Sequence, residues 1–582
     1  MNVLDSRCLS LVAALSAGCG GEFVPVWSSL SPPDGTQLAR PGLSAVGHLM
    51  TPNRPLELGR TDLRVARALT LTLVGAPEGA SIRLRVDEEN AAARAIPAHH
   101  GHVRFDLPVA DEDAGLALVL EAASADVEVL VVDPIVGPVE VGAPGNRPWN
   151  APPDVHLLMA DTFRADNLGL RVGSAPSTKP LTPALDAFAE TAVRFDNARA
   201  AATWTLPSHA SLFTALTPPE IGIVDGLSRL GPEHVTLAER FRAAGYRTVA
   251  ITDAGFVAAA FGLDQGFAHY EETGTIEEPH FERTLAAVER ALDRDDGRPL
   301  LLFVQSYRAH VWTVEPETRE RLGDALMFRP DDVFRSPRWK GAVLELLKSA
   351  EHGAPMAGAD YQAEIASMVP NYRGASADAA AGFGQVLETL EKRGGTASAV
   401  TVFTSDHGEA LGSHGVVSHG NGVWDGQSRV PLLVRAPARA AGSRDDVASL
   451  LDVPRTLCAL AGVEPHPRWR GVDLFASGID GSRLHAVHQT LPARVRYVAA
   501  IEWPWKLVFR DADGPQELVF AYELGGDPEE TRNLAGQLEG TERERRARAF
   551  LENLQPGEAS GERAQPSEAV RGQLEAMGYG GR

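Results

Sequence analysis

The stretch Thr203-Trp204-Thr205-Leu206-Pro207-Ser208-His209 places a hydroxyl residue just before a proline that is well suited to open a helix. A hydroxyl at a helix N-terminus meets the positive end of the helix dipole and free backbone N–H groups. A metal ion that also contacts the oxygen of Thr205 would lower its pKa and make it a nucleophile. The helix is expected to begin near Ala210. The alternative interpretation is that Thr205 only caps this helix.

Two predicted strands end in residue types that bind metals. Residues 155–160 form a near-continuous apolar run, typical of a parallel strand buried on both faces, which leads directly into Asp161. A second apolar run, 398–403, leads into Asp406 and His407. Because ligands gather at the carboxyl ends of strands in open α/β sheets, these side chains are expected to share one site. Together they suit a divalent cation such as zinc, manganese or calcium, although an aspartate after a strand can also be a simple helix cap.

Histidines form a third group of candidates. His310 follows a predicted strand and turn, and His414 and His419 lie in the glycine-rich stretch 412–422. Glycine-flanked histidines on loops are not typical core residues. They can bind a transferred anionic group, protonate a leaving oxygen or hold a second metal, and the sequence leaves these three roles open.

The segments that must position these residues alternate between strand and helix after residue 151. Helical stretches are expected at 183–192, 236–244 and 380–393, and further strands at 247–252 and 299–305. This alternation predicts a doubly wound α/β domain.

The chain before residue 151 has a different pattern. Residues 22–50 are rich in Pro, Gly and Ser and are expected to be a tether. Period-2 alternation then predicts a small β-sandwich, with strands at 68–74, 81–86, 102–107 and 127–132. Residues 142–153 have the composition of a linker.

The first 21 residues resemble an export signal. A short apolar run ends in Ser-Ala-Gly-Cys, which is similar to a bacterial lipobox and makes Cys19 a candidate lipidation site. The prediction is therefore an exported protein, either a periplasmic or an outer-membrane lipoprotein of a bacterium. The alternative is an ordinary N-terminus without a signal. No later segment is long and apolar enough to span a bilayer.

The charge balance narrows the class of partner. The formal net charge is −22, from 77 acidic and 55 basic residues, which argues against nucleic acid as a partner. An anionic ester can still bind where a local cation overrides this field. No protein partner is predicted.

From about residue 153 to the C-terminus, several segments together resemble the sulfatase-like branch of the alkaline phosphatase superfamily. The resemblance implies an alkaline phosphatase-like catalytic domain over 151–480 and an α/β C-terminal subdomain over 481–582. It also implies that Asp161, Asp406, His407 and Thr205 bind the metal. The segments that carry it include Asp161-Thr162-Phe163-Arg164-Ala165-Asp166, Thr205-Leu206-Pro207-Ser208-His209, Thr404 to Gly415, Leu451 to Leu457, and Glu523 to Ala535.

The same resemblance implies roles around the transferred group. His310 and His419 match positions that contact this group, so both are candidate catalytic residues together with Thr205. Candidate substrate-binding residues are Arg164, His209, Arg308 and His414.

The departures from the family pattern affect the chemistry. Typical sulfatases carry Cys or Ser at the position of Thr205 and oxidise it to formylglycine, and threonine cannot become the same aldehyde. A threonine nucleophile resembles instead the phosphodiesterases and phosphoethanolamine transferases of the superfamily, which usually use two metals. Ser306 and Arg308 stand where an aspartate of the second site is expected. The prediction is therefore one divalent metal, with a second left open.

These observations predict a metal-dependent hydrolase of sulfate or phosphate esters, phosphodiesters and phosphonates included. Two alternatives remain at this stage. One is a phosphoryl or phosphoethanolamine transferase, and the other is an inactive surface binding protein with a sulfatase-like fold.

Overall fold

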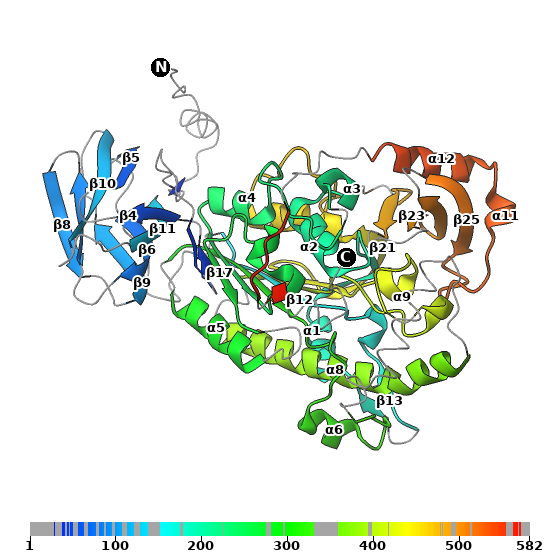
Figure 1. Cartoon of the computed structure of the whole chain (residues 1–582). Helices are drawn as coiled ribbons and strands as arrows, with labels where there is room; N and C mark the ends of the chain where they lie inside the picture. Colours follow the sequence, from blue (N-terminus) through cyan, green and yellow to red (C-terminus); the bar gives the residue numbers. More distant parts are fainter. Residues whose placement is uncertain are drawn as a thin grey trace.

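The computed structural model describes the strands between residues 28 and 137 and most of residues 152–571 (Figure 1). Within the latter range it omits 175–177, 224, 275–280, 295–296, 331–358, 394–397, 417, 478, 480, 490–495, 512–514, 555–562 and 569. The predicted signal, with Cys19, lies outside the described residues, so export and lipidation stay predictions. No helix in the described part is long and apolar enough to cross a membrane.

A ten-stranded sheet forms the centre of the molecule, and its five middle strands are parallel. The predicted α/β architecture is therefore confirmed. In spatial order the strands are β2 (Leu38–Arg40), β3 (Leu43–Ala45), β17 (His269–Glu272), β16 (Arg247–Thr252), β18 (Leu300–Ser306), β12 (Val155–Ala160), β19 (Val400–Thr404), β20 (Leu432–Arg435), β15 (Val193–Arg199) and β21 (Gly442–Ser449).

Strand β12 lies between β18 and β19 and is buried on both faces. Leu157 and Met159 pack into the core on one face of the sheet, and Leu158 and Ala160 pack into the core on the other. Successive side chains of a strand point to opposite faces, so a strand between two cores is apolar on both faces. This explains the near-continuous apolar run that precedes Asp161, in which the one polar side chain, His156, lies 3.2 Å from the Thr401 hydroxyl.

Helices cover both faces of the sheet. One layer contains α2 (Thr205–Thr214), α4 (Leu237–Ala243) and α10 (Val453–Ala461), and the other contains α1 (Pro183–Ala189), α5 (Phe281–Asp293) and α8 (Ala359–Lys392). Further helices are α3 (Pro218–Ile221), α6 (Pro316–Leu322) and α9 (Asp425–Ser428).

Helix α8 has 34 residues and begins well before the predicted stretch 380–393. Pro370 and Gly374 lie in its first half and interrupt the helical pattern, so the sequence predicted only the second half, in which Gly382 and Gly384 lie. The glycines have a packing reason. A Cβ at Gly382 would lie 2.2 Å from the Phe281 ring of α5, and one at Gly384 would lie 2.5 Å from Ala184 Cβ of α1.

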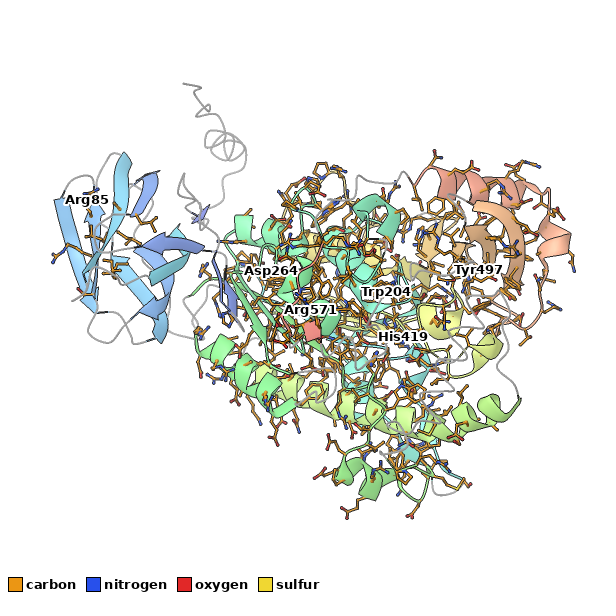
Figure 2. The ribbon with its side chains drawn as sticks, viewed as in Figure 1. Arg85, Trp204, Asp264, His419, Tyr497 and Arg571 are labelled. Atoms are coloured by element: carbon orange, nitrogen blue, oxygen red, sulfur yellow. The ribbon has the colours of Figure 1, made fainter. Side chains whose placement is uncertain are left out.

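The C-terminal subdomain is an antiparallel sheet of β22 (His485–His488), β23 (Arg496–Glu502), β24 (Trp505–Asp511) and β25 (Pro515–Glu523), with α11 (Ala535–Leu538) and α12 (Glu542–Glu552). Figure 2 places Tyr497 in this subdomain. It places Trp204 and His419 in the larger part of the molecule, which is built around the ten-stranded sheet. A fully buried Lys506 joins the two parts. Its Nζ lies 2.9 Å from Asp425 Oδ1 of α9 and 2.7 Å from Glu530 Oε1.

Replacing Lys506 with methionine is expected to lower the free energy of unfolding by about 3–5 kcal/mol, because the change leaves two buried carboxylates with one cation fewer. Arg199, which donates to both Asp425 oxygens, then remains to balance them. Urea unfolding measures the loss. Arg545→Met is the control, since this arginine pairs with Glu542 on the exposed surface and its loss should cost about 0.5 kcal/mol or less.

The N-terminal strands form two antiparallel sheets, which agrees with the predicted β-rich domain; their packing as a sandwich stays a prediction. The first contains β1 (Ser28–Ser29), β4 (Gly47–Met50), β6 (Ala68–Ala76), β9 (His99–Asp106) and β11 (Val129–Gly137). The second contains β5 (Leu56–Asp62), β7 (Ser81–Val86), β8 (Glu89–Ala95) and β10 (Asp113–Glu121). The predicted tether also contains regular structure, because β2 and β3 pair with each other and β3 pairs with β17 of the central sheet.

Candidate active site

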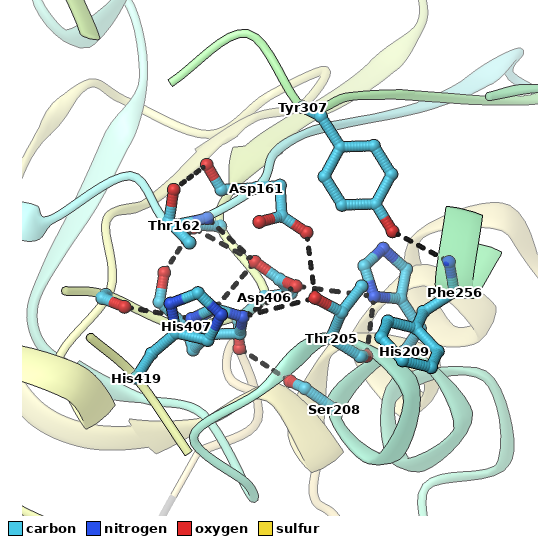
Figure 3. A network of polar contacts seen from close by, with 12 residues as sticks. Asp161, Thr162, Thr205, Ser208, His209, Phe256, Tyr307, Asp406, His407 and His419 are labelled. Carbon is cyan, nitrogen blue, oxygen red and sulfur yellow. Dashed lines mark hydrogen bonds and ion pairs between the residues drawn. The ribbon is translucent and has the colours of Figure 1, made fainter. Parts of the chain in front are cut away.

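Thr205 is the first residue of α2, so the predicted start near Ala210 is too late. A proline is tolerated in the first turn of a helix, and Pro207 therefore lies inside α2 rather than before it. The N-cap is Trp204, whose backbone is extended. The alternative that Thr205 is a plain cap is wrong: its Oγ1 lies 3.2 Å from Asp161 Oδ2 and 3.4 Å from His407 Nε2 (Figure 3).

The parallel pairing of β12 with β19 brings the two predicted strand ends together. Asp161 follows β12, and Asp406 and His407 follow β19, and one ligand atom from each of the three lies within 4.8 Å of the others. All three side chains are fully buried. The structure thus brings together three of the four residues that were predicted to bind a metal, and this group is a candidate metal site.

The donor atoms of this cluster fit a divalent cation. Asp161 Oδ1 and Asp406 Oδ2 are buried and accept no hydrogen bond from the described residues. The other oxygen of Asp406 accepts from the backbone N–H groups of His407 (2.8 Å) and Thr162 (3.2 Å), which fixes the carboxylate. Buried carboxylate oxygens without partners are costly unless a cation offsets them. Two carboxylates, an imidazole and a hydroxyl suit zinc, manganese or calcium.

Thr162 adopts a left-handed backbone with φ of 56°. Its hydroxyl donates to the Asp161 carbonyl at 2.8 Å, whereas its N–H donates to Asp406. A non-glycine residue in this region is strained and persists only where its surroundings hold it. In this conformation Thr162 makes hydrogen bonds to both Asp161 and Asp406, and it thereby links the loops that carry the two aspartates.

The pKa values of the two buried aspartates are shifted in opposite directions, because two neighbouring negative charges are unfavourable in a buried site. Burial, and then the charge of Asp406, raises the pKa of Asp161 well above its ordinary value. Burial acts on Asp406 in the same direction, but His407 and His209 outweigh it, so the pKa of Asp406 is lowered. Burial lowers the pKa of His407 to about 4, which leaves a neutral imidazole able to bind a cation at pH 7.

Metal binding is expected to release protons, because the raised pKa of Asp161 makes a proton compete with the cation for this carboxylate. The affinity for the ion should therefore rise with pH until this carboxyl is ionised in the free protein. Calorimetric titration with zinc or manganese in buffers of different ionisation enthalpy measures the release. Binding enthalpies that do not depend on the buffer would contradict the raised pKa of Asp161.

The predicted histidines His310 and His419 lie beside this cluster. The His419 ring is 4.4 Å from the His407 ring and 5.1 Å from the His310 ring, measured between centroids. Burial, with the neighbouring rings of His419 and His407, lowers the pKa of His310 well below its ordinary value. His310 is therefore a neutral hydrogen-bonding group at pH 7.

His209 lies behind the nucleophile candidate. It is fully buried, its Nδ1 lies 2.9 Å from the Thr205 carbonyl oxygen, and its ring packs edge-on against Phe213 and Phe303. Its Nδ1 is also 3.5 Å from Asp406 Oδ2. These contacts position the first turn of α2 and the acidic pair.

The other three predicted substrate residues are held by different partners. Arg164 donates two hydrogen bonds to Asp166 and one, at 2.7 Å, to the Glu409 carbonyl oxygen. Arg308 is buried in an ion pair with Asp378 of α8 at 2.9 Å and also contacts Glu315. His414 stacks on Trp424 at 4.8 Å, and its Nε2 lies 3.0 Å from the Glu530 carbonyl oxygen. The structure does not bring these three side chains into the cluster around Thr205.

Two residues near the cluster were not among the predicted site residues. Glu409 lies 3.1 Å from His419 Nδ1 through its Oε2. Tyr307 packs edge-on against His310 and accepts a hydrogen bond from the Phe256 N–H. Glu409 had a signal, because it follows Asp406-His407-Gly408 directly, whereas nothing in the sequence distinguishes Tyr307 from a core tyrosine.

Comparison with known proteins decides the family. The sulfatase family model matches residues 153–463, more than half of the chain. The chain belongs to the sulfatase family. As a member, it is a sulfatase-like ester hydrolase with a candidate site for the divalent metal that this family generally uses.

Similar curated proteins carry sulfatase names. The N-acetylglucosamine-6-O-sulfatase of Bacteroides thetaiotaomicron is 22% identical over 69% of this chain and 86% of that protein. The choline-sulfatase of Rhizobium meliloti is 34% identical, but the match spans only 27% of this chain and 31% of that protein.

Solved structures share the fold of this sulfatase-family chain. One was solved in complex with its substrate, D-glucosamine-2-N,6-O-disulfate, and has a TM-score of 0.56 at 18% identity, covering 71% of this chain and 100% of that one. The phosphonate monoester hydrolase of Agrobacterium radiobacter has a TM-score of 0.53 at 19% identity, covering 69% and 94%.

Proposed function

We propose that this protein is a metal-dependent hydrolase of sulfate or phosphate esters in which Thr205 is the nucleophile. The observation that carries the proposal is the position of Thr205 Oγ1, between Asp161 Oδ2 and His407 Nε2 at the start of α2. A hydroxyl used only for packing has no reason to face two buried side chains of the candidate metal-ligand cluster.

The ligands of the ion would be Asp161, Asp406, His407 and Thr205. A divalent cation held there would lower the pKa of the threonine hydroxyl and offset negative charge on the reacting oxygens. Because threonine cannot form the aldehyde of formylglycine, the attacking atom is the side-chain oxygen itself. The fold shared with a phosphonate monoester hydrolase supports keeping phosphorus esters among the substrates.

The residues of the chain divide the work as follows. Thr205 directs its hydroxyl hydrogen towards Asp161 Oδ2 and keeps a lone pair for attack on sulfur or phosphorus. A bond forms between Thr205 Oγ1 and that atom as the bond to the ester oxygen breaks, and the hydroxyl proton passes to Asp161 Oδ2, which returns it when Thr205 is released. His310, as a neutral imidazole, can bind the transferred group, and the neighbouring His419 can hand a proton to the departing oxygen. Water then cleaves the covalent ester and restores Thr205.

A hydrolysis panel tests the proposal. The protein lacking its first 21 residues is stripped of metal, reloaded with zinc, manganese or calcium, and given an aryl sulfate, a phosphate monoester, a phosphodiester and a phosphonate ester. Metal-dependent turnover of at least one ester is expected, and the preferred ester defines the substrate class. Tight metal binding with no turnover of any of the four would contradict the proposal and favour a transferase or a binding protein.

A further inference from the structure

Glu409 and His419 form a buried acid–imidazole pair beside the nucleophile. The distance from Glu409 Oε2 to His419 Nδ1 is 3.1 Å, and both side chains are at least 96% buried. The His419 ring also packs against the His407 ring, with 4.4 Å between the centroids, and His407 Nε2 faces Thr205 Oγ1 (Figure 3). The pair therefore lies directly against the centre at which the ester would react.

The chain holds the Glu409 carboxylate from several sides. Its second oxygen accepts from the Ala410 N–H at 3.2 Å, and its backbone carbonyl accepts from Arg164 at 2.7 Å. The preceding Gly408 lies so close to α9 that a Cβ there would be 2.3 Å from the Gly426 carbonyl oxygen. This close approach and these bonds aim the carboxylate at His419 instead of at solvent.

The contact between Glu409 and one ring nitrogen of His419 determines which nitrogen is left for the substrate. With the Nδ1–H of His419 donated to Glu409, Nε2 is the nitrogen that remains for the substrate. His310 has no comparable carboxylate contact among the described residues. The two histidines beside the nucleophile are therefore not equivalent.

We infer that Glu409 is a positioning residue that orients His419, so that His419 Nε2 donates the proton to the departing ester oxygen. The inference rests on the proposed function. In the first step the S–O or P–O bond to the leaving group breaks, the leaving oxygen takes the proton from Nε2, and the ring becomes neutral. In the second step water forms a bond to the same sulfur or phosphorus atom, the bond from that atom to Thr205 Oγ1 breaks, and Nε2 accepts a proton from the attacking water, which restores the ring.

Leaving groups differ in how strongly their departure depends on protonation. Comparing two such groups therefore tests whether a variant has lost proton donation. A 4-nitrophenoxide leaves readily without protonation, whereas phenoxide depends strongly on it. The quantity kcat/KM reports the steps up to departure of this group, so slow hydrolysis of the covalent ester does not hide the effect. The measurement compares 4-nitrophenyl and phenyl esters of whichever group the wild-type protein hydrolyses.

Glu409→Gln keeps the volume and a neutral acceptor, and it is expected to lower kcat/KM for the phenyl ester about 10-fold and for the 4-nitrophenyl ester about 3-fold or less. Glu409→Ala is expected to lower the phenyl value about 100-fold. In a His419→Ala background, either change should have little further effect, because the oriented group is gone. The bound metal, measured by elemental analysis, should not change.

Three outcomes would overturn the inference. They are an equal loss on both esters, an additional loss in the His419→Ala background, or a loss of bound metal in Glu409→Gln. Glu544→Gln is the matched control, since Glu544 is a largely buried glutamate paired with Arg548 in α12 and its loss should leave the ratio between the two esters unchanged.

Failure of the proposed function gives a different signature. It is seen in the wild-type protein as a lack of turnover, or in Thr205→Ala as retained turnover, before any Glu409 variant is compared.

Discussion

Replacing Thr205 with alanine is expected to abolish ester hydrolysis, with kcat/KM lower by about 10⁴-fold or more. The alanine removes the attacking oxygen and one ligand of the ion, while Asp161, Asp406 and His407 stay in place. The fold should survive, because Thr205 makes its side-chain contacts within the site and Trp204 caps α2. Initial rates on the preferred ester, together with circular dichroism, measure both effects.

The matched control is Thr214→Ala in the same helix. Thr214 is also a buried threonine of α2, but its hydroxyl donates only to the Ala210 carbonyl at 2.7 Å. This variant should lose some stability and keep its activity. Trapping adds a direct test: after rapid acid quenching, the peptide that contains Thr205 should carry the mass of one sulfuryl or phosphoryl group. Retained activity in Thr205→Ala would exclude this residue as the nucleophile.

Removing the divalent ion is expected to eliminate turnover and to lower the thermal stability of the folded protein, and reloading should restore both. Asp406→Asn should weaken metal binding by about 100-fold or more, because the change removes one of two carboxylates and leaves Asp161 as the only full negative charge in the cluster. Melting temperatures with and without zinc or manganese measure the linkage.

The stabilisation by metal has a predictable dependence on pH. The raised pKa of Asp161 means that the metal-free folded state binds a proton more tightly than the unfolded chain does. That contribution to stability is complete below the unfolded pKa of an aspartate, about 3.9, and is lost as pH rises through the folded pKa. The increase in melting temperature on adding metal should therefore be larger at pH 8 than at pH 5. Asp452→Asn, a buried aspartate paired with Arg483, is the control and should leave this difference unchanged.

The sequence was sufficient for the parts of the site that depend on one strand or one turn. The residues Asp161, Asp406 and His407 each follow an apolar run that has to be a buried strand, and parallel strands place their carboxyl ends together. Local pattern therefore predicted both the α/β fold and the metal-ligand cluster.

It was insufficient where a distant partner determines the direction of a side chain. Arg308 is held by Asp378 of α8, and His414 stacks on Trp424, and neither pairing leaves a local trace in the sequence. The first half of α8 was missed for a related reason. Pro370 and Gly374 read as helix breakers along the chain, yet the glycine is the residue that lets Val314 and Phe328 approach the helix.

The short hairpin of β2 and β3 determines where one edge of the central sheet lies. It supplies the strand beyond β17, and a sheet edge without such a neighbour presents a row of unpaired backbone groups to other chains. A protein cut at the linker near residue 150 would keep every residue of the active site but lose this cover. A fragment that begins after residue 150 is therefore expected to aggregate more readily than one that begins before Leu38 and keeps this edge covered.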